Sequence, residues 1–183
     1  DEMVAQTLDL LGAERNINGY LEVGSTGRYA GRLQSALKLS GDMVLLHTAA
    51  PGYSPEDIVE RGGLMKIGRF VPLNEYTAVA PSAVADRSLD LVANYIGFHH
   101  SPLSRLDGFV ASLHRTLRPG GRMIVRDHDV NAPPMNRMVA LAHDVFNMGL
   151  GMAWPYNQSE LRHFTSNIEL ITYLEARGFK GDG

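Results

Sequence analysis

Two segments of the chain bring together residue types that bind a charged small molecule or move a proton. The first, YLEVGSTGRY at 20–29, places an acid and two glycines directly after a short apolar run. Glycine lets a ligand approach the main chain closely, and the N–H groups that begin a following helix attract carboxylates and phosphates. The G-x-G-x-x-G spacing of dinucleotide-binding turns is absent, which disfavours a dinucleotide-dependent oxidoreductase. A plain turn between a strand and a helix is the alternative interpretation.

The second segment pair is FHH at 98–100 and RDHD at 126–129. An imidazole titrates near neutral pH and therefore serves as a general base, and a nearby acid or imidazole orients it. The candidate catalytic residues are His100, His99, Asp127 and His128, with His100 as the first candidate base. The alternative is that the histidines cap a helix or pack against a sheet. The two segments also bring together possible nitrogen and oxygen ligands, so metal-assisted catalysis is a further alternative. No fixed ligand spacing supports a metal site, so no metal is predicted.

A third candidate region is GMAWPYNQ at 151–158, which holds the only tryptophan of the chain. An aromatic loop of this kind either covers a substrate or packs on a sheet face. We predict that Trp154 and Tyr156, together with Asp129, contact the substrate.

Composition narrows the class of protein. The chain has 183 residues, of which 44% are hydrophobic and 20% charged, as in a globular domain. The net charge of -3 gives no bulk electrostatic reason to bind nucleic acid or an anionic membrane. The absence of cysteine excludes disulfides, thiol nucleophiles and cysteine-bound zinc. No signal peptide or membrane-spanning run is visible, and we predict a cytoplasmic protein that acts on a small molecule; the sequence gives no oligomeric state.

Strand and helix patterns alternate along the chain, which predicts an α/β fold: a Rossmann-like, mostly parallel sheet with helices on both faces. The predicted strands are 19–23, 42–48, 69–73, 88–98 and 122–128, and the predicted helices are 3–11, 28–39, 56–60, 103–117, 136–146 and 168–176. We expect the strand order 3-2-1-4-5. Because the carboxyl ends of parallel strands share one rim, segments 24–29, 47–50, 94–100 and 126–129 are expected to meet there.

Three blocks in this order, YLEVGSTGRY, SLDLVANYIGFHH and LHRTLRPGGRMIVRDHD, resemble class I S-adenosylmethionine-dependent methyltransferases of the methyltransferase type 11 kind. HFTSNIELITYLEARGF also resembles the segment before the sixth strand of that family. The resemblance implies one methyltransferase-like domain over 1–183, S-adenosylmethionine as cofactor, and methyl transfer to an unidentified small molecule. The alternative is a non-catalytic methyltransferase-like domain that serves binding or assembly in a larger protein.

The resemblance also implies the cofactor-binding residues. They are Glu22, Gly24, Ser25, Thr26, Gly27 and Tyr29 around the methionine part, His47 and Thr48 near the ribose, and Asn94, Tyr95 and Ile96 in the middle of the site. The chain departs from the family at the second strand, which ends LLHTAAP where the family usually has an acid. The family sheet ends in an antiparallel hairpin, and the sequence stops before it, so we expect a fragment of a longer protein.

Overall fold

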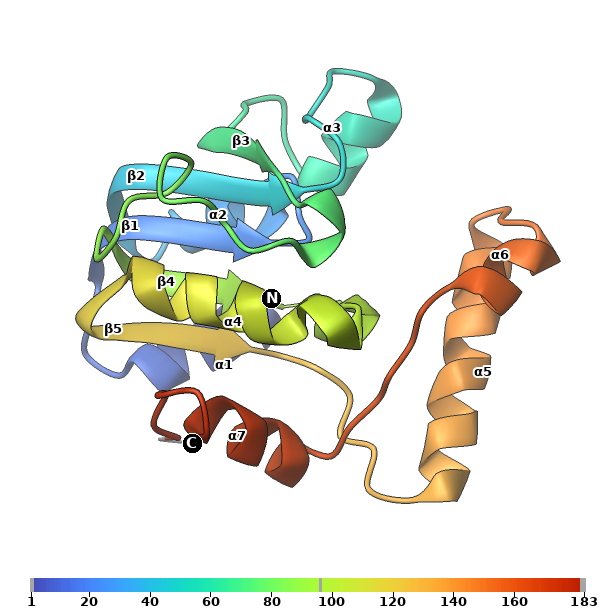
Figure 1. The fold of residues 1–183 in the computed structure, drawn as a ribbon. Helices are drawn as coiled ribbons and strands as arrows, with labels where there is room; N and C mark the ends of the chain where they lie inside the picture. The colour runs from blue at the N-terminus through green and yellow to red at the C-terminus, as the bar shows by residue number, and fades with distance from the viewer. Residues whose placement is uncertain (1, 96, 182–183) are drawn as a thin grey trace.

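The computed structural model describes residues 2–95 and 97–181, and its centre is a five-stranded parallel sheet (Figure 1). The strands are β1 (Asn16–Val23), β2 (Lys38–His47), β3 (Arg69–Pro72), β4 (Leu89–Asn94) and β5 (Leu117–Val125). Their order is β3-β2-β1-β4-β5, and every neighbouring pair is parallel. This confirms the predicted order, with β1 in the centre.

Helices cover both faces of the sheet, as predicted. α1 (Glu2–Leu11) and α2 (Arg28–Leu33) lie on one face, and α4 (Leu103–Thr116) lies on the other, with α7 (Asn167–Glu175) near it (Figure 1). Successive side chains of a strand point to opposite faces. Accordingly Leu21 of β1 joins the core cluster that includes Phe109 of α4, whereas Tyr20 joins the cluster that includes Leu33 of α2.

The remaining elements lie near or beyond the carboxyl ends of the strands. They are α3 (Pro55–Arg61), the short 3-10 helices η1 (Asn74–Tyr76) and η2 (Phe98–His100), α5 (Pro133–Gly149) and α6 (Trp154–Ser159). α5 and α6 form an arm that stands off from the sheet, on the side toward which the strand arrows point (Figure 1). We call these two helices the arm.

Several predicted boundaries are wrong, for local reasons. The helix predicted over 28–39 ends at Leu33, because the chain from Lys38 onward pairs with β1 from Asn16 onward. β5 begins at Leu117 rather than at 122, because a register shift lets the RPGG segment continue the strand. β4 ends at Asn94 rather than at 98, and α6 occupies part of the predicted aromatic loop at 151–158. Within the described residues, no helix combines the length and apolar character that crossing a bilayer requires.

Candidate functional site

Glu22, near the end of β1, is fully buried and organises the glycine turn. Its Oε2 accepts hydrogen bonds from the Tyr20 hydroxyl at 2.7 Å and from the Ala30 N–H at 2.7 Å, and its Oε1 accepts from the Tyr29 N–H at 3.2 Å. Burial raises the pKa of this carboxyl, because the charged form loses its contact with water. Both oxygens are therefore engaged by the chain itself, and Glu22 fixes the start of α2.

Ser25 completes this arrangement. Its Oγ accepts from the Gly27 N–H at 3.2 Å and from the Arg28 N–H at 3.1 Å. The main-chain N–H groups of 27–30 are thus all bonded by two side chains of the turn, whereas the sequence predicted that they would face a ligand carboxylate. A side-chain oxygen placed just before a helix caps these donors readily. The exposed part of the turn is Gly24, whose φ of 76° is in the left-handed region.

Two buried polar side chains beside the turn lack partners. Asn94, at the end of β4, is 0% exposed, and neither its amide nitrogen nor its amide oxygen has a hydrogen-bond partner within 2–95 and 97–181. The Thr26 hydroxyl is in the same state. Each buried unpaired polar group costs about 1–3 kcal/mol. Asn94 pairs in register with Val23, which is three residues before Thr26. Asn94 and Thr26 therefore lie along the same part of the rim.

The end of β2 carries the two predicted residues, His47 and Thr48, and lies beside a carboxylate that was not predicted. His47 Nδ1 lies 3.0 Å from the Ala49 carbonyl oxygen, its Nε2 lies 3.8 Å from Oε1 of Glu60, and Thr48 is exposed. Glu60 belongs to α3 and supplies a carboxylate beside this strand end. The sequence did not single out Glu60, because the acid comes from the following helix and not from the strand itself.

Tyr29 and Tyr95 meet edge to face with their ring centroids 4.9 Å apart, and both are buried. The Thr7 hydroxyl of α1 donates to the Tyr95 hydroxyl at 3.0 Å. A hollow of about 260 Å³ lies next to this contact, bordered by α1, Tyr95 and the end of β5. Tyr95 therefore lines the space between α1 and the end of β5, and Tyr29 packs against it. Ile96, predicted beside them, lies outside the described residues.

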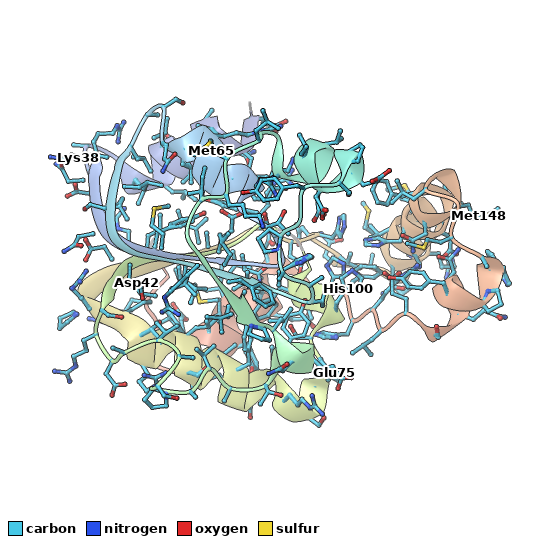
Figure 2. The ribbon with its side chains drawn as sticks, turned by 90° about the horizontal axis from the view of Figure 1, so that it is seen from above. Lys38, Asp42, Met65, Glu75, His100 and Met148 are labelled. Carbon is cyan, nitrogen blue, oxygen red and sulfur yellow. The ribbon has the colours of Figure 1, made fainter. Side chains whose placement is uncertain are left out.

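The predicted catalytic residues come together at the ends of β4 and β5. The ring nitrogen Nδ1 of His99 lies 2.5 Å from Oδ1 of Asp127, and the His99 main-chain N–H donates to the other carboxylate oxygen at 2.9 Å. His100 Nδ1 lies 2.7 Å from the Leu161 carbonyl oxygen, so this nitrogen carries the proton. Figure 2 shows His100 at the junction between the sheet and the arm that carries Met148.

His143 of α5 joins this group, although the sequence gave no reason to select it. Its ring centroid lies 4.9 Å from that of His99, and its Nε2 lies 3.1 Å from Nε2 of His128. We call His99, His100, His128 and His143 the histidine cluster; it holds four of the seven histidines of the chain. A single histidine in an amphipathic helix carries no spacing signal, so only the fold reveals it.

The surroundings of His100, His128 and His143 favour the neutral form of these three imidazoles. Burial lowers the pKa of His100 and of His128, and it lowers the pKa of His143 to about 4, because the charged forms are poorly solvated there. Burial by itself would raise the pKa of Asp127, but the hydrogen bond and charge of His99 outweigh it and hold that pKa below its usual value. The carboxylate is therefore ionised at neutral pH.

The three predicted substrate residues lie in different surroundings. The Tyr156 hydroxyl donates to Glu160 Oε1 at 3.3 Å, and the same oxygen lies 3.9 Å from His100 Nε2, which connects the arm to the histidine cluster. Trp154 is 54% exposed on α6. Asp129 accepts from the Asn167 N–H at 2.9 Å and so holds the start of α7. Glu160, which the sequence did not single out, is the acid nearest His100.

Known proteins identify the fold. No family model and no curated protein match the chain. Among solved structures, a Burkholderia thailandensis 1,6-didemethyltoxoflavin-N1-methyltransferase, with bound 1,6-didemethyltoxoflavin and S-adenosylhomocysteine, gives a TM-score of 0.63 at 15% identity over 100% of this chain and 68% of that one. The chain has the class I methyltransferase fold.

Two further solved structures agree with this assignment. An S-adenosylmethionine-dependent methyltransferase from Mesorhizobium loti gives a TM-score of 0.62 at 12% identity, over 97% of this chain and 81% of that one. The YcgJ protein from Bacillus subtilis gives 0.63 at 14% identity, over 96% and 67% respectively. At identities this low, the likeness shows the fold that these proteins share with this chain, and it leaves the acceptor open.

Proposed function

We propose that residues 1–183 form a single domain that binds S-adenosylmethionine and transfers its methyl group to a small-molecule acceptor. The observation that carries this proposal is that two buried side chains, Asn94 and Thr26, have no partner among the described residues and lie beside the exposed left-handed Gly24. A parallel α/β sheet binds its ligands beyond the carboxyl ends of its strands, where these residues lie. The similar Burkholderia thailandensis structure contains S-adenosylhomocysteine, which supports the choice of cofactor.

The residues present fit such a cofactor. The main chain of 24–26 and the Asn94 amide would hold its methionine part, and His47, Thr48 and Glu60 would lie on its ribose side. Glu22 and Ser25 would act indirectly, because their oxygens already fix the N–H groups that begin α2. Tyr29 and Tyr95 would supply an apolar wall. When bound, the cofactor supplies a methyl group on a positively charged sulfur, which is activated for transfer.

The chain would then hold an acceptor atom in line with that methyl group, which accounts for a large part of the rate in such reactions. His100 is the proposed base for a hydroxyl acceptor. Its Nδ1 is engaged with the Leu161 carbonyl, so a neutral ring presents the lone pair of Nε2. Asp127 fixes the neighbouring His99, and Trp154, Tyr156 and Asp129 stay the predicted substrate contacts. A cytoplasmic location also stays a prediction.

Isothermal calorimetry with S-adenosylhomocysteine tests the proposal. We expect one site per chain, and we expect Asn94→Ala to weaken binding about tenfold or more, since a good hydrogen bond to a ligand is worth about 1.4 kcal/mol. A folded protein that does not bind S-adenosylhomocysteine would contradict the proposal. With binding established, transfer of a labelled methyl group to a panel of hydroxyl and amine compounds would identify the acceptor.

The second candidate is a non-catalytic methyltransferase-like domain that serves binding or assembly. Two observations favour it: the N–H groups that begin α2 are bonded within the chain, and α5 exposes a large apolar face. That face includes Met138 (59% exposed), Leu141 (62%) and Val145 (62%). Such patches commonly mark contact surfaces for other proteins. The same calorimetric titration separates the two candidates, because only the first requires cofactor binding.

A further inference from the structure

The geometry points to a metal site in the histidine cluster: we infer that His99, His100 and His143 together bind one divalent transition-metal ion such as Zn²⁺. Each of these residues offers one ligand atom, and the three atoms all lie within 4.8 Å of one another. Imidazole nitrogen is a favoured ligand of zinc, nickel, copper and iron. The ligands come from three elements, since His99 and His100 follow β4 and His143 lies in α5.

Two of the three rings are already oriented as metal ligands usually are. A ligating histidine typically donates its second ring N–H to a carboxylate or a main-chain carbonyl. His99 meets Asp127 through Nδ1, and His100 meets the Leu161 carbonyl through Nδ1, so both rings leave Nε2 for another partner. His99 Nε2 is buried and has no hydrogen-bond partner in the part of the chain that the structure describes. A metal ion would relieve this unpaired nitrogen.

A second observation concerns the rings of His143 and His128, which are in contact. Their Nε2 atoms lie 3.1 Å apart. Two nitrogens bound to one tetrahedral zinc at about 2.0–2.1 Å are about 3.3 Å apart, so Nε2 of His143 takes part in a spacing close to that of a ligand pair. His128 belongs to a different three-residue grouping, with His99 and Asp127, and is not one of the three inferred ligands.

The site has a structural and a chemical consequence. An ion at this position would join α5 to the ends of β4 and β5, and so would fix the arm to the sheet. Three protein ligands would leave a coordination position for water or for a heteroatom of a bound molecule. A metal-bound His100 does not accept a proton, so occupancy of the site would remove the base role given to His100 above. Metal binding itself needs neither cofactor nor acceptor and stands apart from the proposed function.

The test uses the purified chain without a histidine tag, stripped with a chelator and titrated with Zn²⁺ in competition with a chromophoric chelator. We expect one Zn²⁺ per chain, and a visible ligand-field spectrum with Co²⁺ that reports nitrogen ligands. His143→Ala should weaken Zn²⁺ binding at least about 100-fold, and Asp127→Asn about 10–100-fold. The matched control is His114→Ala, which changes a histidine of α4 outside the cluster and should leave the Zn²⁺ affinity unchanged.

Three results would overturn the inference: no stoichiometric Zn²⁺ binding by the folded parent, unchanged binding by His143→Ala, or equal loss in His114→Ala. His99 is buried and its replacement risks unfolding, so the half-exposed His143 is the better probe, with His143→Gln as a second variant. Circular dichroism on each variant checks the fold. A parallel titration with S-adenosylhomocysteine keeps the two proposals separate, because loss of zinc binding with intact cofactor binding counts only against the metal site.

Discussion

Asp127 holds His99 at two points, accepting one hydrogen bond from the ring and one from the main chain of the same residue. The carboxylate follows β5 and the histidine follows β4, so this contact joins the ends of two neighbouring strands. It fixes the ring of His99 and aims Nε2 away from the acid. The contact therefore sets the geometry of the whole histidine cluster.

Replacing Asp127 with Asn should destabilise the protein and release the His99 ring. A hydrogen bond between charged or partly charged groups in a buried site contributes about 1.5–3 kcal/mol, and asparagine offers one acceptor oxygen where Asp127 offers two, so one of the two His99 N–H groups would lose its acceptor. We expect the free energy of unfolding to fall by about 2 kcal/mol in a urea titration. Histidine ring ¹⁵N NMR should show the Nδ1-protonated form of His99 in the parent and a tautomer mixture in the variant. An unchanged spectrum would contradict the positioning role of Asp127.

Gly24→Val should block S-adenosylhomocysteine binding while the domain stays folded. Gly24 has a φ of 76° and is exposed, so a valine there would strain the turn by about 1–3 kcal/mol and would intrude on a ligand that lies against the main chain. A melting curve and a calorimetric titration on the same sample measure both effects. If the variant binds S-adenosylhomocysteine as tightly as the parent, the cofactor does not lie in this turn.

Gly120→Val is the matched control for that experiment. Gly120 has a φ of 81°, and a Cβ added to it would meet nothing within 4 Å. It lies before the middle of β5, away from the carboxyl ends of the strands. We therefore expect a comparable loss of stability with no change in the affinity for S-adenosylhomocysteine.

The fold was predictable because its signals are local and repeated. Nearly continuous apolar runs such as 89–93, interrupted only by Asp90, favour buried parallel strands. Their alternation with helical patterns favours right-handed crossovers between parallel strands. The errors fell at boundaries such as Leu33 and Leu117, where pairing with a neighbouring strand outweighs the local pattern. Register between strands is a tertiary property that a local pattern does not contain.

The site was predictable only where it follows strand ends. His99, His100 and Asp127 meet because parallel strands end on one rim. His143 lies in the arm, Glu160 directly follows it, and both are isolated in the sequence, so nothing but the path of the chain brings them to that rim. For Glu22 the residue was selected correctly as part of the turn, but its partners are the chain's own N–H groups, and only side-chain geometry reveals that.

Asp42→Asn should give a pH-dependent loss of stability. Arg69 of β3 donates to both carboxylate oxygens of Asp42 in β2 at 2.7 Å, and these hydrogen bonds lower the pKa of Asp42. A lowered folded-state pKa means that the stabilisation is fully present above the unfolded value and is lost as the pH falls through the folded value. Figure 2 shows Asp42 far from His100, so cofactor binding should not change.

We expect Asp42→Asn to lower the free energy of unfolding at pH 7 by about 0.5–1 kcal/mol, since the pair is partly exposed. The difference from the parent should shrink as the pH falls below about 4, the ordinary range for an aspartate. Urea titrations at several pH values measure this. Asp9→Asn, on the exposed side of α1, is the control and should show no comparable change; a gap between Asp42→Asn and the parent that persists undiminished in acid would contradict the assignment.

Asn94→Leu should separate stability from cofactor binding more sharply than any other change. Asn94 is fully buried with both amide atoms unpartnered among the described residues, so an apolar side chain of similar size removes a desolvation cost without opening a cavity. We expect the unliganded domain to keep its stability or to gain about 1 kcal/mol, while S-adenosylhomocysteine affinity falls more than tenfold.

Ser112→Ala provides the contrast, because the Ser112 hydroxyl is buried, donates to the Phe109 carbonyl and accepts from the Val79 N–H. That variant should lose about 1–2 kcal/mol of stability and keep its affinity. Should Asn94→Leu destabilise the domain as Ser112→Ala does and bind the cofactor normally, Asn94 would be an ordinary core residue, and the cofactor position proposed at the ends of β1 and β4 would be wrong.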